Sequence, residues 1–270
     1  MLIFSQLTAY YSLYFRKMIS IVILGTGNVA QNLFEALHKK DEVKVLAVAG
    51  RNTDALNYFS NRTEVFTDWT HLPKADVYLM AIKDDVIHEV SEKLTLDGLL
   101  VHTSGAVPMD ALSKHSHTGV FYPLQSFTSG KILDFKTIPI CVEATSEKDL
   151  NLLKYVASTI SNTVEHIDSN QRKALHVSAV FTNNFTNYLY GIGKQICEEY
   201  TIDFSLLKPL MKETVDKLDV LTPEQAQTGP ARRGDRKTLH SHLQLLNDKK
   251  HREIYKLLSN AIKAHYGKKL

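Results

Sequence analysis

The sequence predicts an α/β fold, in which a doubly wound sheet is followed by an all-helical domain. Short runs of β-branched and aliphatic residues alternate with helical segments up to about residue 167. This alternation is typical of parallel strands joined by crossover helices. From Ser169 onward the strand pattern does not return, and long helical stretches follow. We therefore expect a sheet domain over residues 18–168 and a helical domain over residues 169–270.

Eight segments have the composition of strands: residues 19–24, 43–49, 64–67, 76–82, 99–102, 119–122, 138–143 and 163–167. Helices are expected at residues 28–38, 146–160, 171–200, 205–221 and 244–266, and a further helix should open at residues 83–85. Residues 222–235 contain two prolines and two glycines, so this segment is expected to be an irregular connection.

A glycine-containing turn directly follows the first expected strand. It has the spacing Gly-x-Gly-x-x-Ala, from Gly25 through Gly27 to Ala30, and helical spacing begins at Asn28. In this context Gly25 permits the turn, Gly27 lets the backbone approach a pyrophosphate, and Ala30 lets the helix pack closely on the strand. The helix N-terminus offers free N–H groups to the phosphates. The pattern predicts a dinucleotide cofactor, held by Gly25, Thr26, Gly27, Asn28 and Val29.

The end of the second expected strand indicates which dinucleotide is preferred. An acid here usually bonds the ribose of NAD, whereas a nearby arginine accommodates the 2′-phosphate of NADP. This strand is followed by Gly50, Arg51 and Asn52, and the first acid is Asp54. Arg51 supplies a planar cation and Asn52 a further donor, so the sequence favours NADP. The alternative is that Arg51 is a solvated loop residue.

The carboxyl ends of parallel strands line the ligand crevice in this class of fold. The ends of the fourth and fifth expected strands should therefore border the ribose and nicotinamide through Ala81, Ile82, Lys83, Thr103 and Ser104. For the substrate, the candidates in this region are Ser104 and Gln125, which follows the sixth expected strand.

A polar stripe runs along the first long helix of the second domain. At about 100° per residue, His176, Asn183 and Asn187 fall within about 20° of one line, with Lys173 and Asn184 beside it. The neighbouring residues are apolar, and a buried polar group without a partner is costly. We therefore expect His176 to act as general acid or base, and Asn183 or Asn184 to orient a substrate. Alternatively, these side chains bond nearby backbone or the sheet domain.

Two adjacent arginines form a second candidate substrate site. Arg232 and Arg233 lie between Gly229 and Gly234. Guanidinium groups bind anions bidentately, and the flanking glycines permit close approach. The alternative is a solvated basic loop.

Composition excludes several other classes of function. The net charge of +3 is too small to predict nucleic-acid binding. Cys141 and Cys197 are too far apart in sequence for a disulfide framework or a zinc site, and His102, His115 and His117 lack accompanying acids, so we expect no metal. No apolar run approaches the ~20 residues that span a bilayer, so a cytoplasmic protein is expected.

The first 17 residues carry five aromatic side chains and lack the early positive charge and cleavage site of a signal peptide. Met18 immediately precedes the first strand and is a natural start. We interpret residues 1–17 as an extension that is not native, or alternatively as an arm packed on the body.

Several motifs together resemble one bacterial family. They are the turn at residues 25–30, the His-Thr-Ser-Gly run at 102–105, the Tyr-Pro-Leu-Gln-Ser-Phe run at 122–127, the helix from Leu175 to Phe185, and the segments 228–230 and 233–235. The resemblance covers residues 18–270 and is to proteins with a Rossmann-like domain followed by the domain DUF2520. Their layout is similar to that of pyrroline-5-carboxylate reductase, ketopantoate reductase and the β-hydroxyacid dehydrogenases related to 6-phosphogluconate dehydrogenase.

The resemblance implies an NADP-dependent oxidoreductase whose helical domain closes the active site and mediates homodimerisation. The β-hydroxyacid dehydrogenases place a catalytic lysine four residues before an asparagine on this helix, but Ala179 and Val180 occupy those positions here. The Ser-Gly-Pro run associated with pyrroline-5-carboxylate reductase is also missing from the helix. The lysine chemistry therefore does not carry over, and His176 is the substitute candidate.

The leading hypothesis is hydride transfer between NADP(H) and a small, anionic carbonyl or imine compound. The absence of the catalytic lysine of the β-hydroxyacid dehydrogenases favours an alternative hypothesis. In that alternative the protein is a nucleotide-binding sensor or interaction protein that keeps the Rossmann-like fold without catalysis. A third hypothesis is a structural dimer whose helical domain mainly forms an interface.

Overall fold

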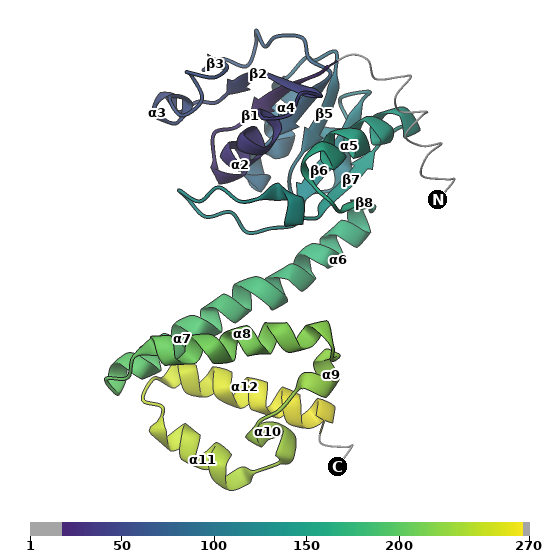
Figure 1. Cartoon of the computed structure of the whole chain (residues 1–270). Helices are drawn as coiled ribbons and strands as arrows, with labels where there is room; N and C mark the ends of the chain where they lie inside the picture. Colours follow the sequence, from purple (N-terminus) through teal and green to yellow (C-terminus); the bar gives the residue numbers. More distant parts are fainter. Residues whose placement is uncertain (1–17, 267–270) are drawn as a thin grey trace. The chain divides into compact units, whose positions relative to one another are not determined.

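The computed structural model describes residues 18–266, and the expected extension at residues 1–17 lies outside the described residues. The first part of the chain is built on an eight-stranded sheet with the order β3-β2-β1-β4-β5-β6-β7-β8 (Figure 1). The strands are β1 (Ile19–Leu24), β2 (Val43–Ala49), β3 (Glu64–Phe66), β4 (Val77–Met80), β5 (Leu99–His102), β6 (Thr118–Pro123), β7 (Ile140–Ala144) and β8 (Val164–His166). All eight expected strands are present, within two residues of the expected boundaries at most ends.

Neighbouring strands are parallel except for β6 and β7, which pair antiparallel. The order reverses direction at β1, which lies between β2 and β4. In open sheets of this kind the ligand crevice lies outside the carboxyl ends of the strands, where the order reverses. The ends of β1, β4, β5 and β6 therefore share the edge at which a site is expected.

Helices cover both faces of the sheet, which confirms the doubly wound α/β fold. In β1, Ile21 and Ile23 pack into the core beneath α2 (Asn28–Leu37) and α5 (Glu147–Ile160). Alternate residues of the same strand, Val22 and Leu24, pack on the other face, where α4 (Ile87–Lys93) lies. The remaining helices of this part are α3 (Thr53–Leu56), the 3-10 turns η1 (Asp84–Val86), η2 (Met109–Leu112) and η3 (Phe135–Thr137), and α6 (Ser169–Ala179).

Compact packing divides the chain into residues 1–179 and 180–270, so that α6 belongs with the sheet. The described residues of the second unit form helices and connecting turns, without a strand. This unit contains a π-helical segment (Val180–Phe185), α7 (Thr186–Glu199), η5 (Phe204–Leu207), α8 (Lys208–Asp216), η6 (Lys217–Asp219), α9 (Pro223–Ala226), α10 (Pro230–Arg233), α11 (Arg236–Leu245) and α12 (Lys249–Tyr266). The fold class expected from the sequence is therefore confirmed in both parts.

Two expectations for the helical unit are wrong in detail. The helix expected over residues 244–266 is two helices, because Leu246 adopts an extended conformation and the carboxylate of Asp248 accepts the backbone N–H of His251 to cap α12. Asp and Asn side chains that bond nearby backbone favour such breaks. The expected irregular connection at residues 222–235 contains the short helices α9 and α10.

The π-helical segment changes the interpretation of the polar stripe. A π-helical turn holds one more residue than an α-helical turn, because its hydrogen bonds run from i to i+5. The projection at 100° per residue from His176 to Asn183 assumes α-helix throughout, and residues 180–185 do not meet that assumption. The apolar neighbours Val177, Phe181 and Phe185 are also exposed on the single chain rather than buried.

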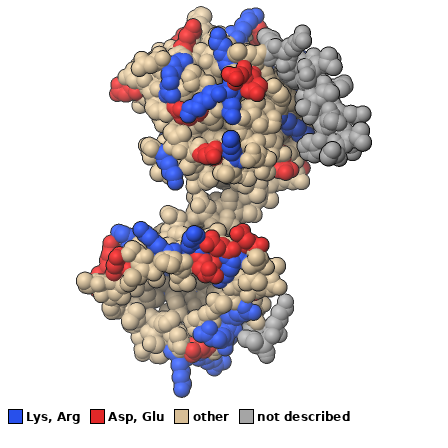
Figure 2. Space-filling view, in the orientation of Figure 1, with Lys and Arg blue, Asp and Glu red and all other residues tan. Residues whose placement is uncertain are grey.

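Basic and acidic side chains both occur on the visible face of each unit (Figure 2). Within residues 18–266, the helices are too short or too polar to cross a membrane. The same described residues contain no cluster of three or more His, Cys, Asp or Glu side chains that could hold a metal ion.

Candidate active site

Gly25 is required at the turn after β1. Its φ is +125°, a conformation that side-chain-bearing residues rarely adopt, and a Cβ atom here would collide with the carbonyl oxygen of Ala81. The turn therefore passes directly against the end of β4. No atom lies within 4 Å of the position a Cβ would take at Gly27, so backbone at that point is open to a ligand. This geometry fits the pyrophosphate of a dinucleotide.

The N-terminus of α2 adds free donors to this turn. Gly27 is its N-cap, no side chain caps it, and its first turn contains no acid. The exposed N–H groups and the positive end of the helix dipole thus remain available to phosphate oxygens. Val29 packs against the core, and the amide of Asn28 donates to the carbonyl oxygen of Phe127 at 3.1 Å. Asn28 therefore ties the β6–β7 connection to the glycine turn.

The turn after β2 places Arg51 in solvent, where it has no hydrogen bond or ion pair to another described residue. Asn52 has a structural role as well, because its side-chain oxygen accepts the N–H of Ala55 at 3.1 Å and caps α3. Gly50 packs closely on the side chain of Thr26. The two residues expected to bind the 2′-phosphate therefore differ in which side-chain groups are free to bind it. The whole Arg51 guanidinium is free, whereas Asn52 has only its side-chain N–H groups free because its side-chain oxygen caps α3.

The ends of β4 and β5 lie side by side, as expected. Thr103 donates its backbone N–H to Met80 at 3.2 Å, while Ala81 donates to Leu24 at 2.7 Å, which joins three strand ends. Ile82 is half-buried and Lys83 is exposed. These residues therefore lie together at the carboxyl ends of β4 and β5.

The turn after β5 is rigid. Ser104 is buried, and its hydroxyl oxygen accepts the N–H groups of Ala106 and Val107 at 3.1 and 3.0 Å. The N–H of Ser104 donates to Nδ1 of His102 at 3.2 Å. Burial, with a smaller effect of the positive charge of Arg172, lowers the pKa of His102 to about 4, so this imidazole is neutral at physiological pH. Ser104 builds this turn and keeps only its hydroxyl hydrogen for a ligand.

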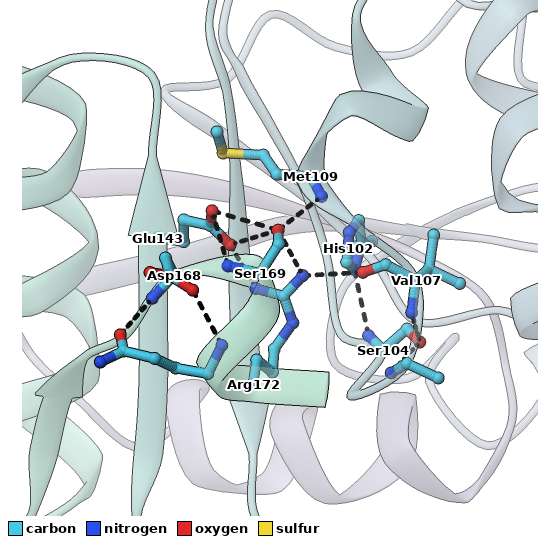
Figure 3. A network of polar contacts seen from close by, with 10 residues as sticks. His102, Ser104, Val107, Met109, Glu143, Asp168, Ser169 and Arg172 are labelled. Atoms are coloured by element: carbon cyan, nitrogen blue, oxygen red, sulfur yellow. Dashed lines mark hydrogen bonds and ion pairs between the residues drawn. The ribbon is translucent and has the colours of Figure 1, made fainter. Parts of the chain in front are cut away.

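A buried arginine joins this turn to α6 (Figure 3). Arg172 is 1 % exposed and forms an ion pair with Glu143 of β7. Its other terminal nitrogen donates to the carbonyl oxygen of Val107 at 2.7 Å and to the hydroxyl of Ser169 at 3.1 Å. Ser169 in turn donates to Glu143 at 2.8 Å and accepts the N–H of Met109 at 3.0 Å. Arg172 thus connects β7, the start of α6 and the loop after β5.

His176 lies one helical turn beyond Arg172. Its Nδ1 is 3.2 Å from the hydroxyl oxygen of Tyr122, the penultimate residue of β6. Gly105 packs against both rings: a Cβ atom there would be 2.6 Å from Nδ1 of His176 and 2.9 Å from the Tyr122 hydroxyl. The described sheet unit thus brings His176 to the edge that carries the glycine turn and the Ser104 turn.

Sequence reasoning did not assign functions to Arg172, Glu143 and Tyr122. One signal was available for the first two, since Glu143 is a lone acid in an apolar strand and a buried charge needs a partner. The Arg172 spacing, four residues before His176, places both on one face of α6. The Tyr122 contact depends on strand order, which the sequence does not specify.

The other residues expected to bind the substrate differ in exposure and in how many contacts their side chains make within the protein. Gln125 is exposed, and its side-chain oxygen accepts the N–H of Ser126 at 2.8 Å. Arg232 donates to the carbonyl oxygen of Gln227 and lies 5.7 Å from the ring centroid of Tyr266, so it holds the helical unit together. Arg233 is exposed; its backbone N–H donates to the carbonyl oxygen of Gly229 at 3.3 Å, and its guanidinium has no hydrogen bond or ion pair to another described residue. Asn183 and Asn184 are exposed within the π-helical segment.

Two known families match different parts of the chain. Residues 20–103 match the family described as NADP oxidoreductase, coenzyme F420-dependent. Residues 138–262 match DUF2520, a domain of unknown function. Comparison with curated protein sequences gave no significant match.

Solved structures resemble the whole two-unit chain. A protein of Bacteroides fragilis, named "putative NADP oxidoreductase", is 38% identical with a TM-score of 0.82, over 90% of this chain and 97% of its own. A Thermotoga maritima protein is 25% identical with a TM-score of 0.73, over 90% of this chain and 99% of its own. A reductive aminase from Aspergillus terreus, solved with NADPH and ethyl levulinate, shares the fold at 10% identity with a TM-score of 0.68, over 93% and 96%.

The fold and the open glycine turn define an oxidoreductase-like protein with an NADP-binding fold. The chain belongs to the family of NADP oxidoreductases in which a Rossmann-like domain precedes a DUF2520 domain. The family resemblance and the NADP cofactor inferred from sequence motifs are thereby confirmed.

The Arg172 ion pair provides a test of the site's architecture. Arg172→Met leaves Glu143 buried without its cation, which typically costs about 3 kcal/mol or more of unfolding free energy. We expect this loss in urea denaturation, with a smaller loss for the matched control Arg62→Met, which breaks a more exposed pair with Glu35.

Replacing both partners, with Arg172→Met and Glu143→Leu together, should recover much of the lost stability, because no charge then remains buried. Equal losses for Arg172→Met and Arg62→Met would show that the buried pair does not carry the architecture.

Proposed function

We propose that this protein transfers a hydride between NADP(H) and a small, anionic carbonyl or imine compound. The observation that supports this most directly is the position of His176, 3.2 Å from Tyr122 at the edge where the glycine turn lies. The sheet unit thereby offers a titratable donor beside the strand ends that bind dinucleotides in this fold class. Bound NADPH supplies the hydride.

Each expected residue has a role in this proposal. His176 moves the proton to or from the substrate, and Asn183 or Asn184 orients the reacting group. Arg233, whose guanidinium is uncommitted, neutralises an anionic substrate, whereas Arg232 supports the helical unit. Lys83 and Thr103 border the cofactor, and Ser104 and Gln125 the substrate. The alternative is a nucleotide-binding sensor that binds NADP(H) without transferring a hydride. The absence of the catalytic lysine found in the β-hydroxyacid dehydrogenases favours this alternative.

The preference for NADP over NAD rests on Arg51. Arg51→Ala should weaken NADPH binding about tenfold and leave NADH binding nearly unchanged, because only NADPH carries the 2′-phosphate. Titration of protein fluorescence with each nucleotide measures both dissociation constants. Lys44→Ala removes an exposed cation from β2 as a control. Equal weakening of both nucleotides by Arg51→Ala would contradict the assignment.

The role of His176 is tested by turnover. A panel of carbonyl and imine acids is first screened for NADPH oxidation by the full chain. With an active compound, His176→Ala should lower turnover about 100-fold or more while NADPH affinity stays near wild type. His166→Ala is the control, because this exposed histidine ends β8 and is not on the crevice edge. Wild-type turnover in His176→Ala would remove His176 from the mechanism, and a panel without substrates would favour the sensor.

We further propose that the protein is a homodimer formed through its helical unit. Large apolar side chains are exposed on the single chain in this unit, and patches of this kind commonly mark interfaces. They include Phe181, Phe185, Tyr188, Leu206, Leu210, Val215, Val220 and Leu257. A second copy of the same surface is the partner that the family layout implies.

The dimer proposal predicts that Leu210→Glu yields a monomer. Leu210 is 64% exposed on α8, and a carboxylate buried at an interface without a partner is costly. Light scattering coupled to gel filtration measures the mass, with Lys212→Glu as a control for added negative charge on the same helix. A monomeric wild-type chain would contradict the proposal.

A further inference from the structure

Tyr122 and His176 are held together by three separate elements of the sheet unit. Tyr122 is the penultimate residue of β6 and is 8% exposed, while His176 belongs to α6. Their rings meet edge to face, with centroids 6.2 Å apart. Gly105, from the turn after β5, lies against both rings, and no larger residue fits there without displacing one of them. The contact is therefore specified by the strand order and by one glycine.

The anchoring of α6 makes this contact rigid. Arg172 precedes His176 by one helical turn and is tied to β7 and to the loop after β5. The position of the imidazole is thus fixed by the same buried network that shapes the Ser104–Gly105 turn. Among the described residues, Tyr122 is the only hydrogen-bond partner that the structure gives to the His176 ring, and it occupies Nδ1.

The Tyr122 hydroxyl is a donor across the physiological pH range. Burial raises the pKa of Tyr122 to about 12, and the Asp84 carboxylate of η1, together with the Cys141 thiolate of β7 that forms only at high pH, acts in the same direction. Arg172 acts in the opposite direction but does not reverse the shift. A protonated phenol can donate to the bare nitrogen of a neutral imidazole; when that nitrogen is Nδ1, the ring's hydrogen lies on Nε2.

We propose that Tyr122 is the proton source behind His176, so that the two side chains form a relay from the core of the sheet unit to the substrate. This inference rests on the proposed hydride transfer. As the carbonyl carbon receives the hydride, its oxygen becomes an alkoxide and takes the proton from Nε2 of His176. Nδ1 takes the hydroxyl proton of Tyr122, and the resulting tyrosinate regains a proton from solvent.

The relay is chemically favourable because it avoids an imidazolate and because its proton transfer runs downhill. A neutral imidazole that donated from Nε2 alone would become an imidazolate, and the phenol proton on Nδ1 prevents this. An alkoxide is a stronger base than a tyrosinate, so the transfer runs downhill even with the raised pKa of Tyr122. Catalysis of reduction therefore does not require a positively charged His176.

The first experiment compares pH profiles of NADPH-dependent turnover for wild type and Tyr122→Phe. Wild-type turnover should stay level between pH 6 and pH 9, because the phenol keeps its proton. Tyr122→Phe leaves only a charged imidazole as donor, and histidines ordinarily lose that charge between pH 5 and 8. Its turnover should approach wild type at pH 5.5 and fall steadily as the pH rises through the range in which histidines ordinarily lose their charge. A profile for Tyr122→Phe with the wild-type shape would overturn the relay.

Two further variants separate this effect from a general disturbance. Tyr155→Phe removes a hydroxyl from α5 in the same unit and should retain the wild-type profile. Gly105→Ala keeps the hydroxyl but inserts a methyl group between the rings, so it should reproduce the loss at high pH. A normal profile in Gly105→Ala, with its thermal unfolding unchanged, would contradict the proposed contact.

The second experiment does not depend on a substrate. In the full chain labelled with ¹⁵N-histidine, the His176 signals are identified by their absence in His176→Ala. We expect the neutral ring to carry its hydrogen on Nε2, and Tyr122→Phe to shift the Nδ1 resonance. A hydrogen on Nδ1 in wild type, or an unchanged resonance in Tyr122→Phe, would overturn the inference.

The two experiments also separate failure of the relay from failure of the proposed function. If the resonances show the expected pair but no carbonyl or imine compound is reduced, the hydride-transfer function fails and the Tyr122–His176 contact stands. If His176→Ala abolishes turnover while Tyr122→Phe has the wild-type pH profile, the function stands and the relay fails.

Discussion

The buried ion pair between Arg172 and Glu143 is the interaction on which the crevice edge depends. Burying two charges costs several kcal/mol per ion, and the cost is offset only where geometry and hydrogen bonding are good. Here the carboxylate also accepts from Ser169, and the guanidinium also donates to the carbonyl oxygen of Val107. The start of α6, strand β7 and the loop after β5 are consequently held in one arrangement. His176 lies on α6 one turn after Arg172, so this arrangement fixes its position.

The glycines at this edge of the sheet have two different structural roles. Gly25 and Gly27 let the backbone turn sharply and remain open, which suits a bound pyrophosphate. Gly105 has a different role, because its missing side chain leaves space for the rings of Tyr122 and His176. Open backbone therefore lies at the end of β1, whereas the contact between Tyr122 and His176 lies at the ends of β5 and β6.

The helical unit differs from the sheet unit in how its side chains are buried and paired. Its helices leave many apolar side chains exposed on one chain, and its two neighbouring arginines differ in their surroundings. Arg232 contacts Gln227 and Tyr266, whereas the guanidinium of Arg233 has no hydrogen bond or ion pair to another described residue. The two adjacent arginines are therefore distinguished only by their contacts. The catalytic roles of His176, Asn183 and Asn184 stay predictions.

The sequence by itself determined the succession of strands and helices along the chain, the change from strands to helices after residue 168, and the glycine turn, because these depend on local periodicity and backbone sterics. Two local predictions were wrong. Asp248 caps a new helix where one continuous helix was expected, and the π-helical segment invalidates the helical projection that placed His176 and Asn183 on one line. Only the tertiary structure decided that Tyr122 meets His176 and that Glu143 meets Arg172. These partners are 54 and 29 residues apart. Contacts of that range follow from strand order and the seating of α6, which are set by global packing rather than by local sequence.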